Sequence, residues 1–297
     1  RVCRQVREVA PDVPVTIATA REQTSLIRRQ LGTQVDISIE PCRRDTLPAI
    51  ALVCAYLHEA RGVPLEEAVA VCPADPYVEP DYFRAVTELL AAAEREGAAR
   101  LFLMGIEPTY PSEKYGYILP ASKAAESRVK SFREKPDEAA AAEYIAQGAL
   151  WNSGVFAFRL GYALEKAQDI FSFHSYEELF RRYEDLPKIS FDYAVVEKEP
   201  SIAVRRYGGT WLDVGTWNTL AEVMPEKTIG RITLDEACTN VHAVSTLSMP
   251  VLCMGLHDAV VAASPEGILI ADKHRASAMK PYVEKLHTPV MYAEKSW

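Results

Sequence analysis

Two aspartates from distant parts of the chain are candidates for a metal site. Asp75 follows a short apolar stretch at residues 68–72 that is typical of a buried strand, and Pro73 ends that strand because proline cannot continue a ladder. Asp213 lies at another element boundary, directly before a predicted helix at residues 214–222. Two such carboxylates can hold one Mg²⁺, which keeps several waters and binds substrate phosphates. The alternatives are an ordinary turn aspartate at position 75 and a helix N-cap at position 213.

The segment of residues 40–49 joins the end of a predicted strand to the start of a helix, and it carries Arg44, Asp45 and Thr46. Exposed amides in the first turn of a helix favour an anion or the polar edge of a ring. The alternative is a helix capped by Asp45 with two arginines on the surface.

Two glycine-containing motifs could line a ligand pocket. Gly116 would let a ligand approach the backbone closely, and the neighbouring Tyr117 could cover a sugar ring. Asn152 can both donate to and accept from hydroxyls, and Gly154 follows it in the same motif. The alternatives are a glycine at a strand bulge and an asparagine in a turn.

Charged residues gather in two further segments. Glu134 and Lys135 stand at the end of a predicted strand, where they could offer a carboxylate to hydroxyls and an ammonium to a phosphate. Asp192 and Glu197 lie on a predicted helix, in which Tyr193 and Glu197 share a face. The alternatives are a surface ion pair of little energetic weight and an ordinary amphipathic helix.

The elements that must position these residues alternate between strand and helix. Short apolar strands and longer helices are predicted in turn at residues 13–18, 20–31, 35–39, 45–60, 68–72, 80–96 and 101–105. This alternation predicts an α/β fold with a mostly parallel sheet and helices on both faces. More polar strands follow at residues 115–119 and 128–133, where the chain should fold over the sheet edge.

The second part of the chain lacks the regular alternation of strands and helices. Further elements are predicted at residues 137–147, 153–159, 160–169, 176–183, 191–198 and 202–207. From about residue 228 short strands follow, at residues 241–244, 251–254, 259–263 and 268–271, before a last helix at 276–286. We therefore predict a larger domain over residues 1–227 and a small β-rich domain over residues 228–297.

Composition narrows the classes of partner. The 297 residues carry a net charge of −8 and are 48% hydrophobic, whereas a protein that grips nucleic acid is usually basic. No apolar run reaches the length of a membrane span. Six scattered cysteines show no CxxC spacing, which favours small core residues in a reducing, cytoplasmic setting. The sequence thus predicts no nucleic-acid or membrane partner.

The order of the motifs resembles the sugar-1-phosphate nucleotidyltransferases, and in particular the bacterial mannose-1-phosphate guanylyltransferases. The resemblance spans about residues 5–225 and rests on IEPCRRDTLPAI, VCPADPYV, GIEPTYPSEKYGYI, SFREKPD, LWNSGVFAF, ISFDYAVVEK and WLDVGTW. It implies a Rossmann-like, glycosyltransferase-A-like fold and the transfer of GMP from GTP to mannose 1-phosphate, giving GDP-mannose and pyrophosphate. Residues 238–286 resemble the small β-helix-like domain of that family.

The resemblance also implies residue roles. Asp75 and Asp213 would hold Mg²⁺, and Lys135 would bind the sugar phosphate and take part in catalysis. Glu134 would bind mannose hydroxyls. The rest of the substrate site would be formed by Arg44, Asp45 and Thr46 near the guanine and by Gly116, Tyr117, Asn152, Gly154 and Asp192 around the sugar.

The sequence departs from the family pattern at two places. The family begins with a strand and a glycine-rich loop that holds the triphosphate, about 40 residues with its helix, the size of one βα unit plus linker, and Arg1 stands after that region. We therefore expect the sequence to be a fragment, and its closing AEKSW resembles the junction to an isomerase domain. Pro76 also replaces a histidine that is common in the family.

Three alternatives stay open. The enzyme could use UTP or dTTP with glucose 1-phosphate, although the segment of residues 40–49 favours guanine. The chain could instead bind nucleotide sugars without catalysis, as a regulatory protein. A homodimer is also open.

Overall fold

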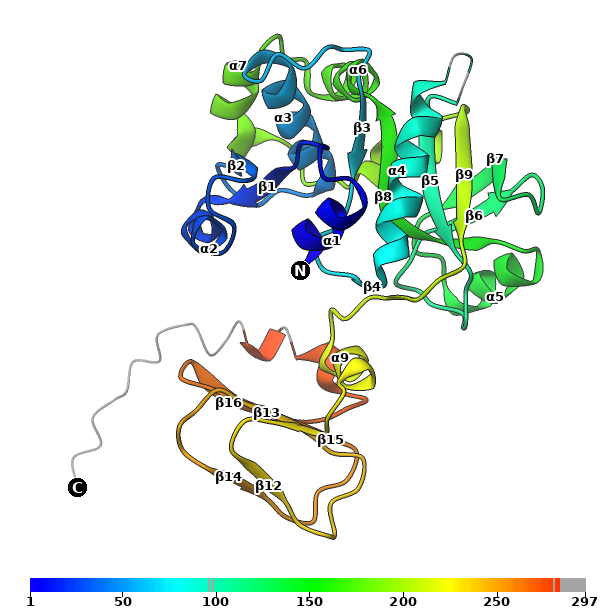
Figure 1. Cartoon of the computed structure of the whole chain (residues 1–297). Coiled ribbons are helices and arrows are strands. Elements are labelled where there is room, and N and C mark those ends of the chain that lie inside the picture. Colours follow the sequence, from blue (N-terminus) through cyan, green and yellow to red (C-terminus); the bar gives the residue numbers. More distant parts are fainter. Residues whose placement is uncertain (96, 98, 280, 284–297) are drawn as a thin grey trace. The chain divides into compact units, whose positions relative to one another are not determined.

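The computed structural model describes residues 1–95, 97, 99–279 and 281–283, which form two compact units (Figure 1). The first unit comprises Arg1–Ala74 and Val78–Thr210, and the second comprises Asp75–Tyr77 and the described residues from Trp211 onward. The division falls after Thr210, earlier than the boundary predicted after residue 227. The reason is that helix α9 (Trp217–Val223) packs against strand β15 (Ala259–Ser264) and so belongs to the second unit.

The first unit opens with the predicted alternation of strands and helices. In chain order the elements are α1 (Val2–Val9), β1 (Thr16–Ala20), α2 (Arg21–Leu31), β2 (Asp36–Glu40), α3 (Thr46–Glu59), β3 (Ala68–Val71), α4 (Pro80–Glu94) and β5 (Leu101–Ile106). The two-residue strand β4 (Tyr77–Val78) precedes α4, and its Tyr77 is assigned to the second unit. The unit continues with β6 (Tyr117–Pro120), β7 (Glu126–Arg133), α5 (Glu138–Ala146), β8 (Leu150–Arg159), α6 (Leu160–Phe171), α7 (Tyr176–Arg181), η1 (Tyr183–Asp185), α8 (Phe191–Ala194), η2 (Val196–Lys198) and β9 (Ile202–Tyr207). The helix predicted over residues 191–198 is therefore two short pieces.

The main sheet of the first unit has six strands in the order β3-β8-β5-β9-β7-β6. Strands β5 and β9 are parallel, but β8 inserts antiparallel between β3 and β5. Strands β1 and β2 form a separate parallel pair. The α/β class is confirmed, while the main sheet is mixed rather than mostly parallel, because β8 returns through its centre and the β6–β7 hairpin extends it.

Helices cover both faces of this sheet (Figure 1). Leu101 and Leu103 of β5 join a core cluster with residues of α3 and α6, whereas the equally buried Phe102 and Met104 point to the opposite face. Helix α4, whose buried residues lie outside that cluster, packs against β3, β5 and β8. In the described part of the chain, none of the helices combines the length and hydrophobicity needed to cross a bilayer.

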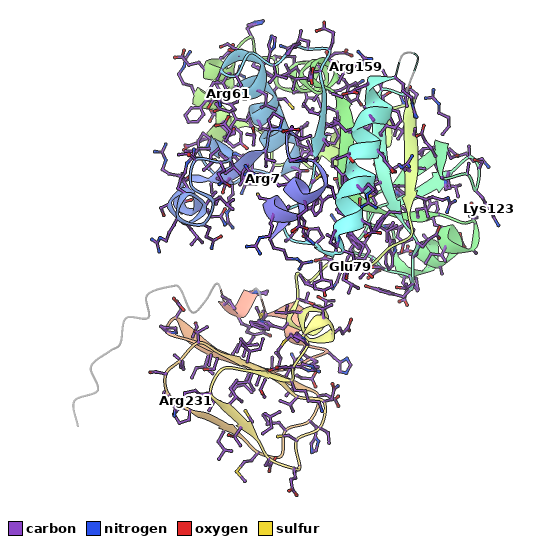
Figure 2. All side chains as sticks on the ribbon, in the orientation of Figure 1. Arg7, Arg61, Glu79, Lys123, Arg159 and Arg231 are labelled. Atoms are coloured by element: carbon purple, nitrogen blue, oxygen red, sulfur yellow. The ribbon has the colours of Figure 1, made fainter. Side chains whose placement is uncertain are left out.

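Long charged side chains connect surface elements of the first unit (Figure 2). Arg7 of α1 donates from Nη1 to Oε1 of Gln34 at 2.8 Å, just before β2. Arg61 pairs through Nε with Oδ2 of Asp36 at 2.8 Å. Exposed pairs of this kind contribute roughly 0–1 kcal/mol, so the buried core supplies most of the stability of the unit.

Gly105 is the tightest glycine position in the sheet, and we predict that Gly105→Ala destabilises the first unit. An added Cβ would lie 2.6 Å from Cδ1 of Leu150 and 2.9 Å from Cγ2 of Val204. Overpacking of a core costs about 1–3 kcal/mol of unfolding free energy, which urea unfolding measures. Gly208→Ala is the matched control, since a Cβ there meets nothing within 4 Å. Equal stability of the two variants would contradict the prediction.

The second unit is a stack of short strands. Its described elements are β10 (Trp211–Leu212), α9, β11 (Thr228–Ile229), β12 (Ile232–Leu234), β13 (His242–Ser245), β14 (Val251–Cys253), β15, β16 (Gly267–Asp272) and η3 (Ala276–Ala278). Strands β11, β13 and β15 form one parallel ladder, and β12 and β14 form another, as expected of a β-helix-like stack. Strand β16 then reverses and pairs antiparallel with β15. The predicted helix over residues 276–286 begins with a 3₁₀ turn, and residues 280 and 284–286 lie outside the described residues.

A buried lysine links the turns of the second unit. Lys273 is 6% exposed, and its Nζ donates to Oδ1 of Asn240 at 2.7 Å and to Nδ1 of His242 at 2.8 Å. Because an ammonium can only donate, Nδ1 must accept and the His242 ring is neutral. Burial, together with the charges of Lys273 and Lys227, lowers the pKa of His242 below its usual value.

We predict that acid weakens the second unit through His242. A folded-state pKa below the unfolded value means that stability is full above about pH 6.5 and falls as the pH drops toward the folded-state pKa. His242→Gln keeps an oxygen acceptor for Lys273 and removes the titration, so the melting temperature should depend less on pH between pH 7 and 5. His274→Gln, at an exposed position, is the control. A wild-type pH slope in His242→Gln would contradict the prediction.

Candidate active site

A strained turn after β7 holds a carboxylate and an ammonium side by side. Glu134 is buried, and Oε1 of its carboxylate lies 2.7 Å from Nζ of the half-exposed Lys135. Lys135 has φ 45°, a left-handed conformation that costs a residue with a Cβ about 1–2 kcal/mol. Burial lowers the pKa of Lys135, but the hydrogen bond and charge of Glu134 outweigh this and raise it overall, so the ammonium stays charged. Strain of this kind concentrates at functional sites.

Asn152 and Asp192 adjoin this turn. Nδ2 of Asn152 donates to Oδ1 of Asp192 at 2.7 Å, and Oδ1 of Asn152 accepts from the backbone of Gly154 at 3.2 Å. Burial, followed by the charge of Glu134, raises the pKa of Asp192 to about 7, although Lys135 and Asn152 act in the opposite direction. The structure therefore brings Glu134, Lys135, Asn152 and Asp192 into one group, in which Asp192 gains or loses its proton near neutral pH.

Gly116 and Gly154, the two predicted glycines, allow close contacts at this site. A Cβ at Gly116 would lie 2.6 Å from Oε2 of Glu134, so only glycine leaves room for that carboxylate. Gly154 has φ 75°, and a Cβ there would lie 3.1 Å from Cγ of Pro73. Pro73 ends strand β3, so Gly154 lets this strand end approach β8 closely.

Tyr117 lies in the core rather than on the pocket wall. It is 1% exposed, and its hydroxyl donates to the carbonyl of Ser112 at 3.0 Å. The same oxygen accepts from the backbone of Ser112 at 2.8 Å and from Nε1 of Trp151 at 3.0 Å. One donor and two acceptor sites are thus filled, so Tyr117 holds the loop before β6 and has no free hydrogen bond for a sugar.

The predicted guanine segment is tied into the first unit. Asp45 is the N-cap of α3, as predicted, and its Oδ1 accepts from the backbone of Thr46 at 2.7 Å. Nε of Arg44 donates to the carbonyl of Tyr183 at 3.1 Å. Oγ1 of Thr46 accepts from the backbone of Phe191 at 2.8 Å. Thr46 thereby fixes the start of α8, directly before Asp192.

The two predicted metal carboxylates belong to the second unit. Asp75 is exposed, and Asp213 is half-buried, directly after β10, with Oδ1 accepting from the backbone of Gly215 at 2.8 Å. Neither carboxylate forms an ion pair with any described residue. The described residues also contain no group of three or more His, Cys, Asp or Glu arranged to hold a metal. Carboxylate oxygens are among the ligands of Mg²⁺, which binds one or two carboxylates together with substrate phosphates.

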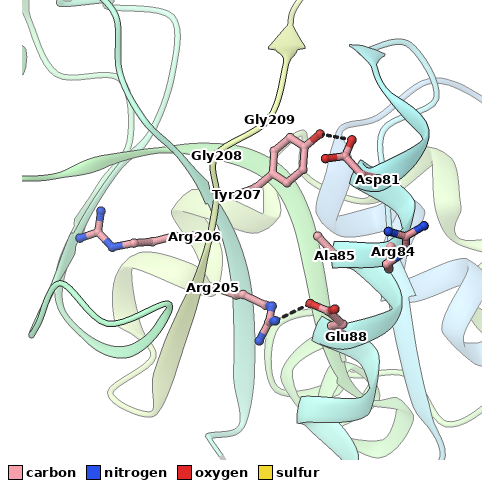
Figure 3. A pocket seen from close by; sticks show the side chains of 9 residues that line it. All are labelled: Asp81, Arg84, Ala85, Glu88, Arg205, Arg206, Tyr207, Gly208 and Gly209. Carbon is pink, nitrogen blue, oxygen red and sulfur yellow. Dashed lines mark hydrogen bonds and ion pairs between the residues drawn. The ribbon is translucent and has the colours of Figure 1, made fainter.

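An open cavity of about 400 Å³ lies elsewhere in the first unit, between α4 and the end of β9 (Figure 3). Arg205 pairs with Glu88 across it, and the hydroxyl of Tyr207 donates to Oδ1 of Asp81 at 2.8 Å. It is lined by Asp81, Arg84, Ala85, Glu88, Arg205, Arg206, Tyr207, Gly208 and Gly209, and by none of the predicted site residues. Arg205, Glu88 and Asp81 already have partners within the cavity. The group around Glu134 is therefore the better candidate site.

Known proteins are similar to this chain over most of its length. Residues 10–228 match the family described as nucleotidyl transferase. The alginate biosynthesis protein AlgA of Pseudomonas aeruginosa is 33% identical, over 89% of this chain and 59% of its own. The mannose-1-phosphate guanylyltransferase of Escherichia coli K12 is 31% identical, over 96% of this chain and 65% of its own. The chain thus spans about three fifths of the length of these curated relatives.

A solved structure shares both units of the fold. The crystal structure of mannose-1-phosphate geranyltransferase from Thermus thermophilus is 30% identical and has a TM-score of 0.78, covering 96% of this chain and 88% of that one. The family match covers all of the predicted site residues, which run from Arg44 to Asp213. The chain therefore belongs to the nucleotidyl transferase family.

Proposed function

We propose that the protein transfers GMP from GTP to mannose 1-phosphate, giving GDP-mannose and pyrophosphate. The observation that carries this proposal is the Glu134–Lys135 turn, which sets a carboxylate beside a charged ammonium next to Asn152. A sugar phosphate has the matching chemistry, with hydroxyl donors on the ring and an anionic group at one end. The names of relatives such as the Escherichia coli enzyme support mannose 1-phosphate as the substrate.

The protein groups contribute mainly by positioning. Glu134 would accept hydrogen bonds from sugar hydroxyls, and Lys135 would bind the phosphate. Asn152 would orient a further hydroxyl. A phosphate oxygen of mannose 1-phosphate would then attack the α-phosphorus of GTP in line, and the bond to pyrophosphate would break. Arg44 and Thr46 would hold the segment that contacts guanine.

Mg²⁺ is part of the proposal. Asp75 and Asp213 would hold the ion, and their lack of cationic partners in the described part of the chain supports this assignment. The ion would neutralise charge on the phosphates of GTP. A cytoplasmic location belongs to the same proposal and rests on the six cysteines, which are scattered without CxxC spacing.

The test is pyrophosphate release by the full natural chain with mannose 1-phosphate, Mg²⁺ and each of GTP, UTP, dTTP and ATP in turn. We expect the highest kcat/KM with GTP. A preference for UTP or dTTP with glucose 1-phosphate would favour the other sugar-1-phosphate nucleotidyltransferases. Binding of GDP-mannose without turnover of any pair would favour a regulatory binder.

A further inference from the structure

We propose that Glu197 is a positioning residue that holds the Glu134–Lys135 turn in its sugar-phosphate-binding geometry, an inference that rests on the proposed function. Glu197 and Glu134 are 63 residues apart, yet Oε1 of Glu197 accepts a hydrogen bond from the backbone N–H of Glu134 at 2.9 Å. Glu197 does not need to touch the sugar phosphate. It acts through the backbone that carries the two residues which do.

The hydrogen bond from the Glu134 N–H to Glu197 lies next to a strained backbone position. Lys135 directly follows the amide that Glu197 holds, and it keeps its left-handed φ of 45°. Such a conformation persists only where surrounding structure enforces it. Without an acceptor for its N–H, the buried Glu134 would lose a charge-assisted hydrogen bond, and Lys135 could relax to a negative φ. The ammonium would then leave its place beside the Glu134 carboxylate.

Glu197 is itself held from both sides. It lies in the 3₁₀ turn η2, after Val195 and Val196, which are buried in the core cluster. Two residues later, Glu199 turns inward, and its Oε2 accepts from the hydroxyl of Tyr162 at 3.0 Å and pairs with Lys166 at 3.2 Å. Glu199 thus anchors this segment in the core, and Glu197 points to the candidate site. This gives Glu197 a fixed position from which to hold Glu134.

The experiment compares Glu197→Ala, Glu197→Gln and wild type in the full natural chain. Calorimetry measures the Kd for mannose 1-phosphate, and steady-state kinetics measure the KM for GTP. Loss of one charge-assisted hydrogen bond should raise the Kd for mannose 1-phosphate about tenfold in Glu197→Ala. The KM for GTP should stay within about twofold. The amide oxygen of Gln still accepts, so Glu197→Gln should bind within about twofold of wild type.

A matched control exists on the other side of the first unit. Oε1 of Glu59 accepts from the backbone N–H of Tyr176 at 2.7 Å, which is the same kind of long-range bond. Glu59→Ala should leave mannose 1-phosphate binding unchanged. If Glu197→Ala fails to fold, Glu197→Met keeps the length of the side chain, removes the acceptor and takes its place in the test.

Hydrogen exchange at the Glu134 amide tests the contact without any ligand. We expect that amide to exchange about tenfold faster in Glu197→Ala than in wild type, and at the wild-type rate in Glu197→Gln. Unchanged exchange and unchanged affinity in Glu197→Ala would overturn the proposal, as would a Glu197→Gln variant as impaired as Glu197→Ala. A wild-type protein that does not bind mannose 1-phosphate would count against the proposed function, and the exchange rates would then decide on Glu197 alone.

Discussion

Asp213→Asn should lower Mg²⁺-dependent turnover by about 100-fold or more while changing the unfolding free energy by less than about 0.5 kcal/mol. The structure separates these effects. Oδ1 of Asp213 accepts from the backbone of Gly215 at 2.8 Å, and the amide oxygen of asparagine can accept the same bond. The substitution therefore keeps the local backbone and removes the charge that a divalent cation needs. Turnover as a function of Mg²⁺ concentration and thermal unfolding measure the two effects.

The second unit offers a matched control for this substitution. Oδ1 of Asp235 accepts from the backbone of Gly255 at 2.9 Å, the same type of bond to a glycine amide. Asp235→Asn should leave turnover and its Mg²⁺ dependence unchanged. Normal activity in Asp213→Asn, or an equal loss in both variants, would remove Asp213 from the metal site.

The motifs of the sequence named several residues that the structure brings together in the first unit. Glu134 directly follows β7, Asn152 is the third residue of β8, and Asp192 lies in the short helix α8 and accepts from Asn152. Chemistry-bearing residues at such boundaries can be recognised because the apolar runs on either side define the strands. The partners that fix them, however, come from segments far away in the chain and have no local signal.

Tyr117 shows where the prediction lacked a geometric step. Residues next to one another in extended backbone point to opposite faces. Gly116 faces the carboxylate of Glu134, so its neighbour Tyr117 must face the interior, where it is 1% exposed. The strand period of two, applied to a glycine on the pocket side, is therefore enough to exclude Tyr117 from the pocket wall.

The order of strands could not be predicted in the same way. Strand β8 is buried along almost its whole length because it is covered on both faces, and such burial carries no information about strand direction. Its antiparallel insertion between β3 and β5 is therefore a tertiary result. The contact of Glu197 with Glu134 could not be predicted either, because it also depends on tertiary structure. The helix predicted as continuous is broken at Val195, with φ −119°. The β-branched pair Val195–Val196, which forms helix poorly, was the one available signal.

Two substitutions of Lys135 should separate the role of its ammonium from the strain of its backbone. Lys135→Met removes the ammonium and should raise the KM for mannose 1-phosphate by about 10–100-fold, the value of one or two charge-assisted hydrogen bonds to a phosphate. Lys135→Gly removes the ammonium too, but it also relieves the strain at φ 45°, so it should be about 1 kcal/mol more stable than Lys135→Met, in which the buried Glu134 lacks the same partner. The KM for GTP should change little in both variants. Steady-state kinetics and urea unfolding separate the two effects.

Ser172 provides the control for the strain. It has φ 51° at the C-terminal end of α6, so Ser172→Gly should stabilise the protein to a similar extent and leave the KM for mannose 1-phosphate unchanged. If Lys135→Gly is no more stable than Lys135→Met, although Ser172→Gly is more stable than wild type, the turn is not strained in the free protein. If Lys135→Met binds mannose 1-phosphate as wild type does, the ammonium does not bind the phosphate. Weaker binding of mannose 1-phosphate in both Lys135 variants, with Lys135→Gly the more stable of the two, would show that the strained turn is kept because the ammonium binds the ligand.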